Sequence, residues 1–278
     1  MAMDFIDPWS PDWWQHLVRT HEALQEGQQL QLLIDSAFIP NLHRSLRQAG
    51  ASLSYLFDGN PGDPDTLRSV SPLLWTFDPA KAAVHKVLAA GSGAPMLSAL
   101  VTPEPQEVLA RRLHAWCVVE VDGQWFNCRF PDTRRLPGIL TALTPEQRGQ
   151  MTGPATSWHW IGRDGRWVVW SLAAPAHAAV QEATLAPAQF SAILDDAMAD
   201  EVLFKFMMQG EHSGLRHAAL HALVAKALPV AQAQGLPDGS CVAWCSHWVA
   251  QAVGLPDGQM GEAELQRAWQ NWLQENAA

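Results

Sequence analysis

Residues 117–130 read CVVEVDGQWFNCRF, a pattern typical of two paired strands. Two runs rich in β-branched and aromatic residues flank Asp122-Gly123, a dipeptide suited to a tight primed turn because glycine tolerates positive φ. Counting outward from this turn places Val119 opposite Phe126. The stretch therefore predicts a β-hairpin.

The two faces of this hairpin differ in polarity. Apolar side chains that a core would bury share one face: Cys117, Val119, Val121, Phe126, Cys128 and Phe130. Amphipathic side chains suited to a partner surface share the other: Trp116, Val118, Glu120, Trp125, Asn127 and Arg129. Neither face offers an evident nucleophile or a set of metal ligands, so the pattern favours binding over catalysis.

Size and charge limit the functions of the chain. Its 278 residues suffice for one large domain or two modest ones. The formal net charge is −10, and the basic runs are no longer than Arg111-Arg112 and Arg134-Arg135. A nucleic-acid backbone is therefore a poor partner.

The start of the chain and its apolar runs bear on its location. The first residues, MAMDFIDPWSPDWW, lack the positive start and apolar core of a signal peptide. No run approaches the ~20 uncharged apolar residues that span a bilayer. We expect a cytoplasmic protein with no membrane partner, in which all four cysteines, Cys117 and Cys128 included, are free thiols.

Short apolar runs alternate with helical patterns in the first half of the chain. Strands are expected at 30–37, 53–57, 72–77 and 96–101, and helices at 40–49, 79–90, 105–113 and 133–143. This alternation predicts an α/β or α+β layer, and the hairpins make its sheet mixed rather than parallel.

A second hairpin is expected at residues 158–170, WHWIGRDGRWVVW, around Asp164-Gly165. A two-residue turn there would divide the side chains between two faces. One face would hold Trp158, Trp160, Trp167 and Val169, and the other His159, Ile161, Val168 and Trp170.

The composition shifts at Ala173-Ala174-Pro175, and everything beyond it has helical periodicity. The sequence therefore predicts an α+β fold with two lobes. The N-terminal lobe, residues 1–172, is a mixed-sheet α/β lobe with two β-hairpins. The C-terminal lobe, residues 173–278, is all α.

Cys241-x3-Cys245-x-His247 is the constellation that most resembles a metal site. Zinc sites use tighter cysteine spacing and a second ligand pair, which is missing nearby. The two cysteines also share an apolar stripe with Trp244 and Trp248, where free cysteine packs as a small apolar residue. We therefore expect no metal and no cofactor. The enzymatic alternative, a Cys- or His-dependent hydrolase, requires Cys245 or His247 in an open cleft.

Three charged residues each have two interpretations. Asp35 ends an apolar run and is either a functional carboxylate at a strand end or, as we favour, a cap for the helix after Pro40. Arg129 and Asp132 form either a structural ion pair or a docking site, and the sequence favours neither. Arg129 over Trp116 would add a cation–π contact.

Seven segments carry a resemblance when taken in order. They are 32–37 (LLIDSA), 56–59 (LFDG), 71–74 (SPLL), 109–113 (LARRL), the hairpin at 122–123, 129–132 (RFPD) and 143–147 (LTPEQ). Over residues 30–170 the chain thereby resembles the effector adaptors, the Tap or TEC chaperones, of bacterial type VI secretion. The family pattern near residue 129 is Arg-Phe-Tyr-Asp-Pro-Arg, from which this chain departs at Pro131 and Thr133.

The resemblance implies a non-enzymatic loading factor. Such adaptors hold a toxic effector protein in the cytoplasm and deliver it to the VgrG spike protein, with a PAAR tip protein as a further partner. The candidate partner-binding residues are Asp58, Trp116, Trp125, Arg129, Asp132 and Arg134.

The tryptophan content alone suggests a third function, a carbohydrate-binding module. The chain has 14 tryptophans against a single tyrosine. Exposed coplanar rings would support sugar binding, but most of these tryptophans fall on apolar stripes that a core explains more simply.

Overall fold

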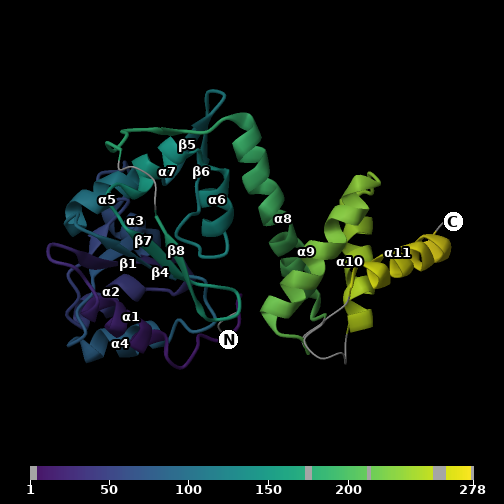
Figure 1. The fold of residues 1–278 in the computed structure, drawn as a ribbon, viewed down its shortest axis with the longest axis horizontal. Coiled ribbons are helices and arrows are strands. Elements are labelled where there is room, and N and C mark those ends of the chain that lie inside the picture. The colour runs from purple at the N-terminus through teal and green to yellow at the C-terminus, as the bar shows by residue number, and fades with distance from the viewer. Residues whose placement is uncertain (1–4, 173–176, 212–213, 253–260, 277–278) are drawn as a thin grey trace. The chain divides into compact units, whose positions relative to one another are not determined.

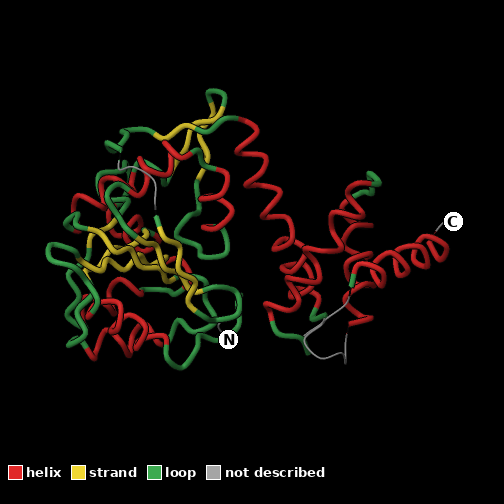
Figure 2. The backbone as a smooth tube through the Cα atoms, in the orientation of Figure 1, coloured by secondary structure: helices red, strands yellow, loops and turns green. Residues whose placement is uncertain are grey.

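The computed structural model describes residues 5–172, 177–211, 214–252 and 261–276. The chain divides between Ile193 and Leu194 into two compact units. Among the described residues, the strands lie in the first unit and the second unit is helical (Figures 1 and 2). These features confirm the predicted fold class, an α+β N-terminal part followed by helices.

A six-stranded sheet forms the centre of the first unit. Its strand order is β2-β3-β1-β4-β7-β8, and every neighbouring pair is antiparallel. The strands are β1 (Gln29–Asp35), β2 (Ser54–Tyr55), β3 (Pro72–Thr76), β4 (Leu97–Thr102), β7 (Ser157–Ile161) and β8 (Trp167–Ser171). Each residue of β4 is buried, as is each residue of β1 after Gln29, which explains their nearly continuous apolar sequences.

Helices cover both faces of this sheet. They are α1 (Trp13–Glu22), α2 (Leu42–Gln48), α3 (Pro64–Val70), α4 (Ala82–Ala89), α5 (Gln106–His114), α6 (Leu136–Ala142) and α7 (Pro145–Thr152). Side chains of α1, α2 and α4 share one apolar core with Leu32 and Ile34. Those of α5, α6 and α7 share the other with Leu33, because successive side chains of β1 point to opposite faces.

The first predicted hairpin is confirmed. Strands β5 (Val118–Val121) and β6 (Gln124–Asn127) pair with Val119 opposite Phe126. Asp122 and Gly123 between them have φ of 49° and 77°, the signature of a type I′ turn. The predicted apolar face is buried, apart from the half-buried Phe126.

The second hairpin forms with a different register from the one predicted. Its turn is longer than Asp164-Gly165, since the Gly162 N–H donates to the Arg166 carbonyl at 2.8 Å. Trp158 therefore lies opposite Trp170, and Trp160 opposite Val168. A shift of one residue moves every side chain of a strand to the other face, so the predicted grouping of Trp167 and Val169 with Trp158 and Trp160 is wrong.

The first unit extends beyond residue 172. Strand β9 (Ala183–Thr184) pairs parallel with β5 in a second sheet of order β6-β5-β9. The prediction that the chain is helical from residue 173 is therefore wrong for this segment. Helix α8 (Pro187–Gln209) follows, and its Phe190 and Ile193 pack on the core of the first unit.

The second unit has its own core. It contains the rest of α8 with α9 (His217–Ala233), α10 (Asp238–Ala252) and α11 (Glu262–Asn276). The stripe predicted on α10 is buried, with Trp244 and Trp248 fully enclosed. Among the residues described, no helix has both the length and the apolar character needed to cross a bilayer.

Candidate partner-binding site

Asp35 lies where β1 ends and two other segments meet it. One carboxylate oxygen accepts a hydrogen bond from the Ala37 N–H at 3.1 Å, which caps the short helix η1 (Ser36–Phe38). The expectation that Asp35 caps the helix after Pro40 is wrong, because the N-cap residue of α2 is Asn41. The cap therefore belongs to η1 and fixes the direction of the chain as it leaves the sheet.

Arg129 is the charged partner of Asp35. Its guanidinium donates to the second carboxylate oxygen of Asp35 at 2.9 Å. Asp35 is 2% exposed whereas the Arg129 side chain is 54% exposed. Burial raises the pKa of Asp35, and the nearby Arg129 opposes that shift. The pair therefore connects a buried carboxylate to a guanidinium at the surface.

Asp132 pairs with Arg134 and not with Arg129. Its two oxygens accept bonds from Arg134 Nε at 3.1 Å and Nη2 at 2.7 Å, a bidentate arrangement. The ion pair predicted between Arg129 and Asp132 is therefore wrong, because Arg129 pairs with Asp35 and the buried Asp132 pairs with Arg134. The pair holds the turn that follows the hairpin, since the Arg134 N–H also donates to Asp132.

Phe38 lies beneath both guanidinium groups. The central carbon of Arg129 lies 6.0 Å from the Phe38 ring centroid, and that of Arg134 lies 5.8 Å away. Trp116 is only 1% exposed, so the predicted cation–π contact between Arg129 and Trp116 is wrong. Placing Trp116 on the outer face of the hairpin was also wrong, because its N–H bonds to Leu113 in a turn before β5 begins.

Four of the seven segments that carry the family resemblance meet in this region. The Ser36 hydroxyl donates to the Ser71 carbonyl at 2.7 Å, and the Phe57 N–H donates to the Ser71 hydroxyl oxygen at 3.0 Å. Together with the Asp35–Arg129 pair, these bonds join segments 32–37, 56–59, 71–74 and 129–132. Residues far apart in the sequence therefore build one end of the six-stranded sheet.

A cavity of about 300 Å³, here called the Arg129 pocket, opens beside this region. It is lined by Asp35, Ala37, Phe57, Val70, Pro72, Cys117, Asn127, Cys128, Arg129 and Pro131. Its walls are mostly apolar, and Arg129 is the cation among its lining residues. Its volume is at the lower end for ligand pockets. The arrangement suits one apolar side chain followed by a hydrogen-bond acceptor for Arg129.

Trp125 lies on the outer face of the hairpin as predicted. Its side chain is 53% exposed, and Val118 on the neighbouring strand is also exposed. Exposed tryptophan is unusual in a chain that buries most of this residue type, and tryptophan is enriched at binding hot spots. Arg129 and Trp125 are therefore the two predicted site residues most accessible to a partner on this hairpin.

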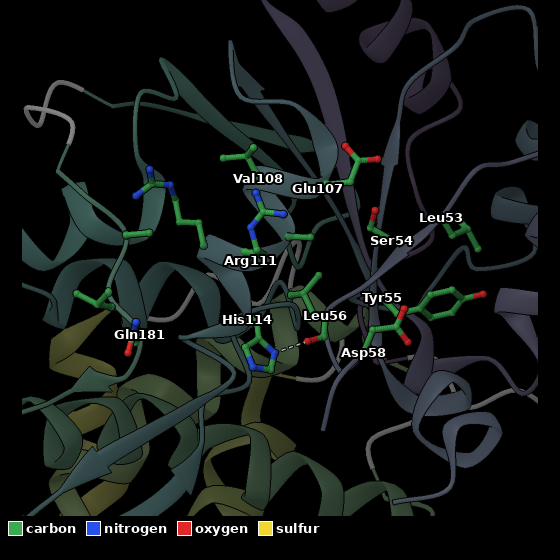
Figure 3. A pocket seen from close by; sticks show the side chains of 14 residues that line it. Leu53, Ser54, Tyr55, Leu56, Asp58, Glu107, Val108, Arg111, His114 and Gln181 are labelled. Atoms are coloured by element: carbon green, nitrogen blue, oxygen red, sulfur yellow. Dashed lines mark hydrogen bonds between the residues drawn. The ribbon is translucent and has the colours of Figure 1, made fainter. Parts of the chain in front are cut away.

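Asp58 lies in a different place, beside a second cavity of about 630 Å³ (Figure 3). It is half exposed and forms an ion pair with Arg68 at 3.2 Å. In Figure 3 the His114 ring reaches the Leu56 carbonyl, which gives this cavity a fixed polar wall next to β2. The structure therefore brings Arg129, Asp132 and Arg134 together but leaves Asp58 at a separate cavity.

A chain of three polar side chains was missed by the sequence analysis. The Ser157 hydroxyl lies 2.9 Å from His159 Nε2, and His159 Nδ1 lies 2.9 Å from His16 Nε2. The spacing of Ser157 and His159 on one strand could have revealed their shared face, but nothing local pointed to His16. Burial, and then the charge of His16, lowers the pKa of His159 to about 4. Such a weak base is poorly matched to acid–base catalysis near pH 7. The hydrogen bonds among Ser157, His159 and His16 therefore join α1 to β7.

The cysteines are placed as the sequence predicted, buried and unpaired. Burial raises the pKa of Cys245 to about 12 and that of Cys128 to about 12. Cys245 is fully buried on α10 and therefore does not lie in the open cleft that the hydrolase alternative requires. In the described part of the chain, no group of three or more His, Cys, Asp or Glu side chains has a geometry suited to a metal ion.

Comparison with known protein families finds a match over part of the chain. No curated protein and no solved structure matches the sequence. Residues 30–150, which include η1, the first hairpin and the Asp35–Arg129 pair, match the protein family described as Domain of unknown function (DUF4123).

Proposed function

We propose that this chain is a non-enzymatic adaptor that binds a toxic effector in the cytoplasm and loads it onto the VgrG spike of a type VI secretion system. The observation that carries the proposal is the convergence of four of the seven resembling segments on one end of the sheet, through the Asp35–Arg129 pair and the bonds of Ser36 and Ser71. All seven segments lie within residues 30–150, the stretch that matches the DUF4123 family.

The accessible residues of this region support protein binding. Arg129 offers guanidinium donors at the rim of an apolar pocket, and Trp125 presents a large ring with a polar edge. Arginine and tryptophan are the side chains most often found at energetic hot spots of interfaces. The net charge of −10 favours a partner with basic patches.

The two alternative functions receive less support. A hydrolase that uses Cys245 would need to expose a thiol that the structure encloses. A carbohydrate-binding module would need several exposed tryptophan rings, and Trp125 is the tryptophan whose side chain is more than half exposed. An adaptor needs neither an exposed cysteine thiol nor several exposed tryptophan rings.

Binding between purified components tests the proposal. The full-length chain is mixed with the purified spike protein and, separately, with the purified toxin encoded beside it, and each mixture is analysed by size-exclusion chromatography. The proposal expects a stable complex with at least one of the two. Failure to bind either one would contradict it.

A further inference from the structure

Helix α8 carries apolar side chains on two opposite sides. One side holds the residues that are buried in the core of the second unit: Ala199, Val202, Leu203 and Phe206. On the other side Leu194, Phe204 and Met208 are 50%, 49% and 65% exposed. These three residues belong to none of the apolar cores that the described residues form. One apolar side of α8 therefore stabilises the second unit, and the other lies open to solvent.

The open side of α8 has the spacing through which helices pair. Its residues, here called the α8 stripe, follow one another in alternating steps of three and four positions: Leu194, Ala197, Glu201, Phe204 and Met208. Such steps keep the side chains in one narrow line along a helix, the seam through which two helices pack. The side chains of a strand alternate every second residue and would match this line poorly. The spacing therefore favours a helical partner.

Glu201, in the middle of the α8 stripe, sets the charge of that partner. It is exposed, and no cation of the described chain lies within ion-pair distance of it. A helix packed on the stripe would remove this carboxylate from water, which is unfavourable unless a Lys or Arg faces it. Lys205 borders the stripe, but residues 194–278 contain ten Asp and Glu against four Lys and Arg. Charge complementarity therefore favours a basic helix.

The same charges disfavour a second copy of the chain. In a parallel pair of α8 helices two Glu201 carboxylates would face each other, because the same seam position is aligned in both copies. In either direction two acidic second units would approach each other, and like charges repel. The α8 stripe therefore suits a different protein.

We propose that the α8 stripe binds a basic amphipathic helix of the toxin. The apolar residues of that helix pack against Leu194, Phe204 and Met208, and a Lys or Arg faces Glu201. The stripe lies outside residues 30–150, the stretch that matches the DUF4123 family. The matched stretch suits a partner that family members share, the spike, so the stripe is assigned to the partner particular to this chain. This inference rests on the proposed adaptor function and names the surface that holds its cargo.

The Phe204→Gln variant of the full-length chain tests the apolar part of the stripe. Glutamine is a good helix former, and Phe204 lies outside the core, so the urea unfolding midpoint should stay close to wild type. The matched control is Val169→Thr, which changes an equally exposed apolar residue of the first unit. We expect Phe204→Gln to weaken binding of the purified toxin about tenfold and to leave binding of the purified spike protein unchanged. The control should bind both proteins as wild type does.

Two variants of Glu201 test the charge of the partner. Toxin affinity of the wild type should fall as NaCl is added, and less steeply for Glu201→Gln, which removes the carboxylate. Glu201→Lys should lose more affinity than Glu201→Gln, because like charges then face each other. A gain in affinity for Glu201→Lys would mean that an acidic segment binds here and would overturn the inference.

Photo-cross-linking tests whether the partner is a helix. Benzoylphenylalanine replaces Leu194 in one variant and Met208 in another, and mass spectrometry locates the attachment points on the purified toxin. The two positions lie 14 residues apart on α8, which is about 21 Å. A toxin helix spans that distance with about 14 residues and an extended segment with about six. Attachment points about six residues apart would contradict a helical partner.

The outcomes separate the two proposals. If the wild type binds neither purified protein, the adaptor function and this inference both fail. If it binds the spike protein alone, or if Phe204→Gln binds the toxin as tightly as wild type, only this inference fails. Loss of spike binding in Phe204→Gln would assign the stripe to the spike, and a wild-type dimer that Phe204→Gln dissociates would assign it to a second copy. Either result would overturn the inference.

Discussion

Arg129 donates a 2.9 Å hydrogen bond to Asp35, although 94 positions separate them in the sequence. The bond joins the end of β1 to the end of the first hairpin, at the rim of the Arg129 pocket. Asp35 is buried and Arg129 is half exposed, so each residue has a different role. Asp35 caps η1 and fixes the end of β1, whereas Arg129 presents its guanidinium group at the surface.

The Asp35→Asn variant tests the buried carboxylate. Because burial raises the pKa of Asp35 in the folded state, the unfolded chain loses this proton at lower pH than the folded chain does. The contribution of Asp35 to stability is therefore complete below its unfolded pKa and falls as pH rises through its folded pKa. In urea titrations between about pH 3 and pH 7, wild type should lose stability relative to Asp35→Asn as pH rises. The opposite slope would mean that Arg129 lowers the pKa more than burial raises it.

Trp125→Ser should weaken partner binding with little effect on folding. Trp125 is 53% exposed, and truncation of exposed side chains usually changes stability by no more than about 0.5 kcal/mol. Arg129→Ala should weaken binding and also lower stability, because it leaves the buried Asp35 carboxylate without its charged partner. Binding to the spike protein or the toxin is measured beside urea unfolding. Unchanged affinity in both variants would mean that the surface formed by Arg129 and Trp125 does not contact the partner.

Trp116→Ala is the contrasting variant on the same hairpin. Trp116 is buried in the first unit, and removal of such a side chain costs about 3–5 kcal/mol. The expected result is a large loss of unfolding free energy, with binding affected only through the loss of folded protein. A stable Trp116→Ala variant that binds poorly would instead mean that Trp116 contacts the partner.

Arg112 should be the charged residue most important for folding. It binds Glu104 in a bidentate pair at 2.6 and 2.9 Å and donates to the carbonyls of Gln150 and His177. Arg112→Met keeps the apolar stem but leaves Glu104, whose side chain is only 12% exposed, without its partner, at a cost of about 3–5 kcal/mol. Adding Glu104→Gln should recover part of that loss in urea unfolding. An Arg112→Met variant as stable as wild type would contradict this role.

The buried cysteines predict slow thiol chemistry. Burial raises the pKa of Cys245 to about 12, and only the thiolate reacts readily with alkylating reagents. Iodoacetamide at neutral pH should therefore modify the native chain far more slowly than the chain in urea, as followed by mass spectrometry. Cys245→Ser should lower stability by about 1–3 kcal/mol, since it places a hydroxyl in an apolar helix interface. Rapid labelling of native Cys245 would restore the hydrolase alternative.

Local signals predicted the first hairpin better than the second. Asp122-Gly123 supplies two adjacent residues at positive φ, so the turn alone sets the register. In the second hairpin the turn closes between Gly162 and Arg166, and the dipeptide Asp164-Gly165 was a misleading centre. Both strands were predicted correctly, but the side chains of β8 were assigned to the wrong faces of the sheet.

Long-range relationships explain most of what the sequence did not reveal at the site. Four α-helices and five strands lie between Asp35 and its partner Arg129 in the sequence, and no local pattern identifies that partner. Trp116 was misplaced because strand alternation was extended into a turn that belongs to the end of α5. The exposed Trp125, within the regular strand β6, was placed correctly.

A tagged pull-down from the native cell, analysed by mass spectrometry while the secretion system is expressed, tests the central claim most directly. The account predicts that wild type recovers the spike protein or the toxin encoded beside it, and that Arg129→Ala recovers less. Recovery of neither protein by the wild-type chain would contradict the adaptor function.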